Sequence, residues 1–109
     1  MTRERLPNRR PSVTSCFRWP AENARRVHVT AGFEPGTGTI KEMFLRGGGR
    51  VGSEVDHLLD DIAVLVSRLL QHGESSEKIA NDLGRLPDGR PASIAGAALD
   101  ALQLLRNGR

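Results

Sequence analysis

The sequence predicts an α+β domain, with a three-stranded antiparallel β-meander followed by a long helix and two shorter helices packed on one face of the sheet. Three observations lead to this fold class. Two stretches of alternating apolar and polar residues and a third apolar stretch lie within residues 12–46. Apolar residues then recur at helical three-and-four spacing from residue 55 to residue 70. An alanine-rich run of helical spacing follows near the end of the chain. Consecutive strands followed by consecutive helices are typical of α+β proteins.

The three predicted strands are joined by short turns, which favours pairing between sequence neighbours. The first, from Ser12 to Trp19, places Cys16 on the face opposite its apolar residues. The second, from Arg26 to Phe33, alternates most cleanly. The third, residues 40–46, does not alternate, so it is either central or bulged near Met43, with both sides covered. The turn before it contains Glu34, Pro35, Gly36, Thr37 and Gly38.

The long helix is expected to begin at Ser53 as its N-cap and to stop before Gly73. Its predicted core stripe is Val55, Leu58, Leu59, Ile62, Ala63, Val66, Leu69 and Leu70. Either Ser75 or Ser76 caps a short helix that ends at Gly84. After a turn at residues 86–89, Pro91 and Ser93 start the last helix. Its stripe is Ile94, Ala97, Ala98, Ala101, Leu102 and Leu105.

Charge is distributed unevenly along the 109 residues. Residues 1–50 contain ten Lys or Arg and four Asp or Glu, whereas residues 51–109 contain six and nine. A basic first half favours an acidic partner, either nucleic acid or a protein surface. The single cysteine excludes an internal disulfide, and a reducing cytoplasm fits it. No signal peptide or apolar run of membrane length is recognised, so we expect a cytoplasmic protein without membrane contact.

Residues 1–11 are predicted to form a basic extended arm, separate from a single domain at residues 12–109. The arm contains two prolines and few apolar residues. Arg9 and Arg10 are its candidate contacts to a partner or to nucleic acid. A mobile tail or a strap over the sheet is the favoured alternative, because no aromatic residues lie between the arginines to stack on bases.

A glycine-rich turn precedes the long helix and is a candidate phosphate or nucleotide site, because free N–H groups and the helix dipole favour an anion there. Its candidate residues are Gly47, Gly48, Gly49, Arg50, Gly52 and Ser53, with Arg46 as a further contact. The spacing of Gly47 and Gly52 matches a Walker loop, but the lysine of that motif is missing and Glu54 would repel phosphate. A tight turn that needs positive φ is therefore favoured over a ligand site.

No catalytic or metal-binding constellation is recognised. The three histidines, His28, His57 and His72, are not spaced as metal ligands with one another or with Cys16. Asp56, Asp60 and Asp61 lie on the outer side of the long helix, where a solvated face is favoured over acid–base chemistry.

Several short runs together resemble the TSCPD domain. The runs are Arg5–Arg10, His28–Phe33, Glu42–Leu45, Gly47–Gly48 with Gly52–Ser53, Leu70–Gly73, and Gly84–Arg85 with Pro87–Ser93. This domain is similar to the C-terminal appendage of adenosylcobalamin-dependent (class II) ribonucleotide reductases. Of the name-giving Thr-Ser-Cys-Pro-Asp pattern, only Thr14-Ser15-Cys16 is present.

The resemblance implies an accessory or interaction domain that works in trans on a reductase or another nucleotide or nucleic-acid enzyme. The reductase's radical cysteine, redox cysteine pair and cobalamin site belong to a barrel too large for this chain. We therefore expect no ribonucleotide reduction and no bound adenosylcobalamin by this chain alone, the cofactor entering only through the family association. A third interpretation is a holoenzyme subunit that contacts nucleotides at the glycine turn. The sequence leaves the oligomeric state open.

The alternative is a small basic regulator that binds DNA or RNA. Residues 76–84 superficially resemble the first helix of a helix-turn-helix, and residues 93–96 a second. However, the link between them is long and this half of the chain is acidic, so the N-terminal arginines would have to supply the affinity.

Overall fold

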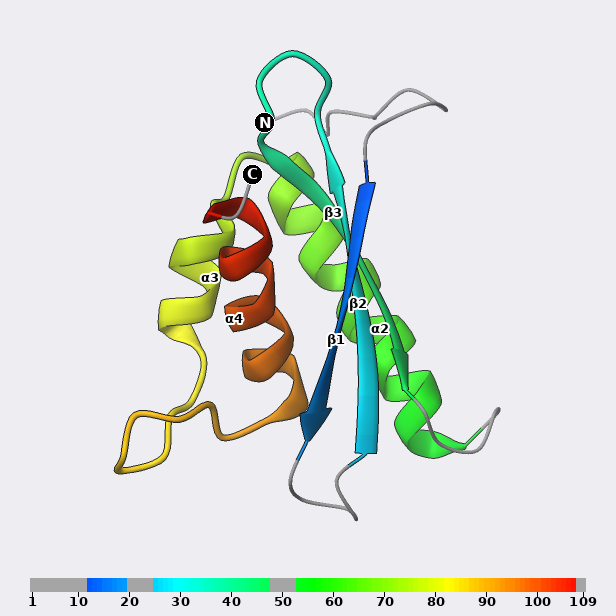
Figure 1. Cartoon of the computed structure of the whole chain (residues 1–109), viewed down its shortest axis with the longest axis vertical. Coiled ribbons are helices and arrows are strands. Elements are labelled where there is room, and N and C mark those ends of the chain that lie inside the picture. Colours follow the sequence, from blue (N-terminus) through cyan, green and yellow to red (C-terminus); the bar gives the residue numbers. More distant parts are fainter. Residues whose placement is uncertain (1–11, 20–24, 48–52, 108–109) are drawn as a thin grey trace.

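The computed structural model describes residues 12–19, 25–47 and 53–107. Its sheet has three strands in the order β1-β2-β3, and both neighbouring pairs are antiparallel. The strands are β1 (Ser12–Trp19), β2 (Arg25–Phe33) and β3 (Ile40–Gly47). Three helices, α2 (Glu54–Gln71), α3 (Ser76–Asp82) and α4 (Ile94–Asn107), follow along the chain (Figure 1). The predicted α+β meander with three helices is confirmed.

The register between β2 and β3 shifts where Gly32 pairs with Glu42 but Phe33 pairs with Ile40. Lys41 is therefore the extra residue of a bulge, two positions before the predicted site at Met43. β3 is an edge strand, so the prediction that it is central is wrong. The prediction that both faces of β3 are covered is also wrong, because Phe44 is 51% exposed. The turn before β3 forms as predicted, with Gly36 at φ 92° and Gly38 at φ 72°.

The helix caps follow the local chemistry of serine and glycine. Ser53 is the N-cap of α2, and its Oγ accepts a hydrogen bond from the Asp56 N–H at 3.2 Å. Gly73 has φ 102°, the left-handed conformation predicted for the end of α2. Ser75, not Ser76, caps α3. α3 ends at Asp82 with an extended Leu83, so the prediction that Gly84 stops this helix by a left-handed turn is wrong.

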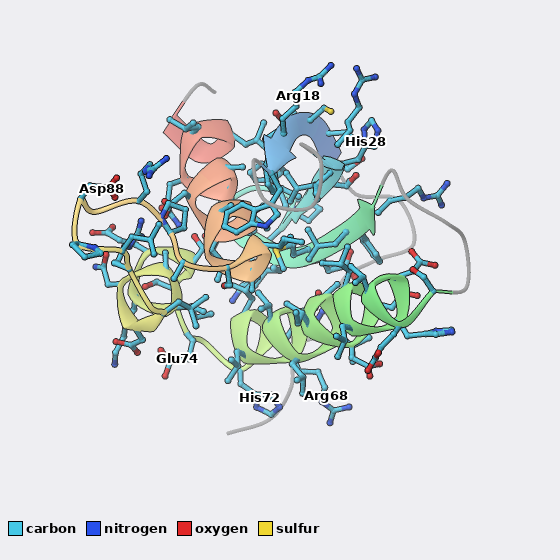
Figure 2. The ribbon with its side chains drawn as sticks, turned by 90° about the horizontal axis from the view of Figure 1, so that it is seen from below. Arg18, His28, Arg68, His72, Glu74 and Asp88 are labelled. Carbon is cyan, nitrogen blue, oxygen red and sulfur yellow. The ribbon has the colours of Figure 1, made fainter. Side chains whose placement is uncertain are left out.

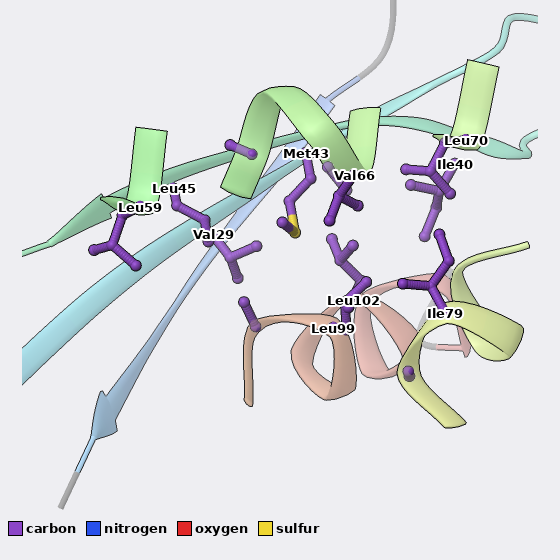
Figure 3. Close-up of a cluster of buried hydrophobic side chains, with 14 of the residues drawn as sticks. Val29, Ile40, Met43, Leu45, Leu59, Val66, Leu70, Ile79, Leu99 and Leu102 are labelled. Atoms are coloured by element: carbon purple, nitrogen blue, oxygen red, sulfur yellow. The ribbon is translucent and has the colours of Figure 1, made fainter. Parts of the chain in front are cut away.

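The core lies between one face of the sheet and the helices (Figure 3). α2 packs mainly on β3, α4 lies over β1 and β2, and α3 packs against α4. The fully buried side chains include Val27, Val29, Phe33, Met43, Leu70, Leu99 and Leu102. The helices therefore cover the same sheet face, as predicted.

Only part of the predicted α2 stripe is buried. Leu59, Ala63, Val66 and Leu70 belong to the core, whereas Leu58 is 53% exposed and Leu69 is 45% exposed. For these last two leucines the prediction of core burial is wrong. The apolar surface of α2 is wider than the surface that the sheet and α4 cover.

Side chains of α2 occupy the free edge of β3. Ser67 Oγ accepts a hydrogen bond from the Met43 N–H at 2.9 Å and donates one to the Met43 carbonyl at 3.0 Å. Gln71 Nε2 donates to the Lys41 carbonyl at 3.2 Å, and Lys41 Nζ donates to the Leu70 carbonyl at 3.4 Å. The Met43 N–H and the carbonyls of Met43 and Lys41 on this edge are thus bonded to a helix.

An ordered loop connects α3 and α4. Arg85 forms a two-pronged ion pair with Asp100 of α4, at 2.7 and 2.8 Å. Gly89 has φ 89° in the predicted turn, and the Leu86 N–H donates to the Arg90 carbonyl at 2.8 Å. Ser93 begins the last helix as predicted, since its Oγ accepts from the Gly96 N–H at 3.2 Å.

Candidate functional site

The sheet face opposite the core is not covered by any helix of the described chain. Because side chains alternate along each strand, this open face displays the residues between the buried ones. The register arranges them in four cross-strand rows: Ser12–Gly32–Glu42, Thr14–Thr30–Phe44, Cys16–His28–Arg46 and Arg18–Arg26. Figure 2 shows the labelled Arg18 and His28 of this face on the side of the molecule opposite Arg68 and His72. We call the eight residues of the last three rows the open sheet face.

Positive charge dominates the open sheet face. Arg18, Arg26 and Arg46 are all exposed, and none of the three makes an ion pair within the part of the chain that the structure describes. Phe44, half exposed, lies two residues from Arg46 on the same strand face. An exposed aromatic ring beside unpaired guanidinium groups can receive a flat or anionic partner.

A groove of about 830 Å³ runs from this face around the β3 edge to the first turns of α2. Its sheet wall includes His28, Phe44 and Arg46, and its helix wall includes Asp56 and Asp60. The two carboxylates lie one helical turn apart, and they repel phosphate from that wall. An anion is therefore favoured only on the sheet side of the groove.

The candidates that the sequence predicts fall partly outside the described residues. Gly48, Gly49, Arg50 and Gly52 of the glycine turn lie outside them, as do Arg9, Arg10 and the rest of the arm at residues 1–11. Gly47 ends β3 and lines the groove, while Ser53 caps α2. Of the two described residues of the turn, Gly47 therefore belongs to the groove and Ser53 to the start of α2.

The structure groups Arg46 with Arg18 and Arg26, two residues that sequence reasoning did not propose as contacts. Their signal was already in the pattern, since both lie at the polar positions of predicted strands. Strand pairing was needed to show that Arg18 stands directly opposite Arg26. A strand pattern gives the face of a residue, whereas the register gives its neighbours.

Chemically reactive residues are sparse in the described chain. Cys16 is exposed and pairs with His28 across β1 and β2. Within the described residues, no three His, Cys, Asp or Glu side chains are grouped to hold a metal ion. Among the described groups, only Arg85 and Asp88 have pKa values that clearly depart from their ordinary ranges. Both lie in the loop between α3 and α4.

Adenosylcobalamin, which enters through the family resemblance, does not fit the described surface. The groove of about 830 Å³ is open, and carboxylates line one wall. It offers no enclosed apolar cavity to hold a corrin ring away from water.

Several runs that carry the family resemblance have structural roles. Leu70–Gly73 ends α2 and supplies the Gln71 bond to β3. Arg85 links the loop between α3 and α4 to Asp100. These contacts position the helices on the sheet and leave the open sheet face uncovered.

Comparison with known proteins gives one family match. The family model described as the TSCPD domain matches residues 2–105, nearly the whole chain. No curated protein and no solved structure matches the chain. In the described part of the chain, none of the helices combines the length and apolar character needed to cross a bilayer.

Proposed function

This chain belongs to the TSCPD domain family, and we propose that it is an accessory domain that acts in trans on an adenosylcobalamin-dependent ribonucleotide reductase. The observation that supports the proposal is the TSCPD match over residues 2–105, taken together with the similarity of that domain to the reductase appendage. In this proposal the radical chemistry and the cofactor stay on the reductase chain, in the cytoplasm, and this domain supplies binding.

The open sheet face is the surface we propose for docking. It is rigid, because all three strands are paired and their other face is packed in the core. Its exposed arginines fit an acidic surface, since guanidinium groups bind carboxylates with two parallel hydrogen bonds. Phe44 adds an apolar contact in the row next to that of Arg46. An aromatic anchor flanked by arginine is a frequent composition of binding centres.

The test is association with the purified class II reductase from the same cells, measured by biolayer interferometry together with ribonucleotide reduction. We expect binding that raises or lowers the reduction rate and that Arg46→Glu weakens at least tenfold, because the charge is reversed at a central contact. Lys78→Glu is the matched control, since Lys78 is exposed on α3, which packs against α4 and lies outside the open sheet face. No association and an unchanged reduction rate would reject the accessory role.

A second candidate function is binding of single-stranded nucleic acid on the same face. The specific observation in its favour is Phe44 beside Arg46, because a base stacks on an exposed ring while arginines bind the neighbouring phosphates. The carboxylates of Asp56 and Asp60 at the groove oppose it. A third role is nucleotide contact at residues 47–53, of which Gly47 lines the groove.

Salt dependence separates the two candidates. Three arginine–phosphate contacts would give a slope of about −2 in log affinity against log salt for a single strand. Fluorescence anisotropy with a labelled mixed-sequence DNA decamer and the matching RNA measures this slope. Undetectable or salt-independent binding would reject the nucleic-acid role and leave the reductase test unaffected.

A further inference from the structure

α2 has a second apolar stripe that its own fold leaves uncovered. Leu58, Ile62, Leu65 and Leu69 follow one another at intervals of four, three and four residues. This is the spacing of the a and d positions of a coiled coil. Leu58 is 53% exposed, Leu65 62% and Leu69 45%, and Ile62 is partly buried against the core. We call these four residues the outer stripe.

The outer stripe and the core stripe lie on different sides of α2. At 100° per residue, the centre of the outer stripe lies about 100° around the helix from the centre of Leu59, Ala63, Val66 and Leu70. The β3 side of α2, marked by Ser67 and Gln71, lies in the opposite direction from the core stripe. A second helix can therefore pack along the outer stripe without displacing β3.

We propose that the outer stripe pairs antiparallel with the same stripe of a second copy of this chain. In that arrangement Leu58 packs against Leu69 of the second copy, and Ile62 packs against Leu65. The two-fold axis repeats both contacts, so four apolar layers form along one seam. In the dimer, the leucine side chains that are half exposed in the single chain become buried against one another.

Charge complementarity selects the second copy and the antiparallel direction. Asp61 and Arg68 occupy the same flanking heptad position beside the stripe, and both are exposed. Antiparallel pairing brings Asp61 within two residues of the level of Arg68 on the second copy, about 3 Å of helix rise. The symmetry then makes two ion pairs. Parallel pairing would instead direct Asp61 toward Val66, which is buried in the core of the second copy.

The open sheet face is a poorer surface for self-association. Two copies meeting there would bring Arg18, Arg26 and Arg46 against the same arginines, and like charges in contact oppose binding. A dimer through the open sheet face is therefore disfavoured. The α2 seam is short, so we expect a weak dimer whose population depends on protein concentration.

Analytical ultracentrifugation of the full chain from about 5 to 500 µM tests the proposal. We expect a shift from monomer to dimer over this range, and Leu65→Gln should weaken dimerisation at least tenfold. Val64→Gln is the matched control, because Val64 is 57% exposed on the same helix but lies off the stripe. Circular dichroism verifies that both variants fold. A monomer at every concentration, or equal effects of the two substitutions, would overturn the proposal.

A charge exchange tests the antiparallel direction separately. Asp61→Arg and Arg68→Asp should each weaken the dimer about tenfold, because each places like charges opposite one another twice. The double variant should recover most of the affinity, since it restores both pairs with their signs reversed. A double variant no tighter than either single variant would reject the antiparallel pairing. None of these outcomes depends on binding to a reductase.

Discussion

Replacing Ser67 by alanine tests whether α2 closes the β3 edge through this one hydroxyl. The Ser67 Oγ bonds both the N–H and the carbonyl of Met43, at 2.9 and 3.0 Å. Alanine leaves these two backbone groups beneath α2 without their partner. The Met43 side chain itself stays fully buried in the core, so the substitution removes hydrogen bonds and leaves the apolar packing in place.

The expected loss of stability follows from two opposing contributions. Two hydrogen bonds of about 1 kcal/mol each are lost. Alanine is a better helix former than serine by about 0.5 kcal/mol, which offsets part of that loss. The free energy of unfolding should therefore fall by about 1.5 kcal/mol. For a domain of this size, the midpoint of thermal unfolding should fall by about 6 °C.

Urea unfolding followed by circular dichroism at 222 nm measures the change. Ser12→Ala is the control, because Ser12 is exposed at the start of β1 and should change stability by less than about 0.5 kcal/mol. Ser67→Ala should also aggregate faster on partial unfolding, since an unprotected edge strand pairs with other chains. A variant as stable as the unsubstituted protein would refute the assignment of edge closure to Ser67.

Three further predictions concern the helix ends and the loop between α3 and α4. Gly73→Ala should lower the unfolding free energy by about 1 kcal/mol in urea titration, because φ is 102° there. The Arg90 backbone N–H and side chain hold the pKa of Asp88 below its usual range. This carboxylate therefore favours folding above its unfolded pKa, and the benefit disappears as pH falls through the lowered value. In carbon-detected NMR titration, Arg90→Ala should raise the Asp88 pKa toward normal, and no change would contradict this. Arg85→Lys should speed hydrogen exchange in the loop, because lysine cannot form the two-pronged pair with Asp100.

Local sequence patterns predicted most of the elements. Strand alternation located β1 and β2, and the caps Ser53 and Gly73 fixed both ends of α2. The periodicity of α2 could not show how much of its apolar surface would be covered. Leu58 and Leu69 have the same spacing as core residues, and only the position of α4 leaves them outside.

Contacts between distant residues could not be predicted in this way. The irregular pattern of residues 40–46 indicated a bulge, but its position at Lys41 depends on the register with β2. Ser67 is an ordinary polar position of a helix until it lies beside Met43. For the candidate site, Arg46 was proposed from the sequence, whereas its grouping with Arg18 and Arg26 required the pairing of three strands.

The two edges of the sheet differ in whether they can accept another strand. The β3 backbone groups at Lys41 and Met43 are bonded to α2, whereas beside β1 the described chain places no further strand. A strand from a neighbouring segment or another protein can therefore pair with β1 but not with the part of β3 that α2 occupies. Any such addition would widen the basic surface from the Arg18 side and leave the groove beside α2 unchanged. Growth of the sheet and access to that groove are thus independent in this fold.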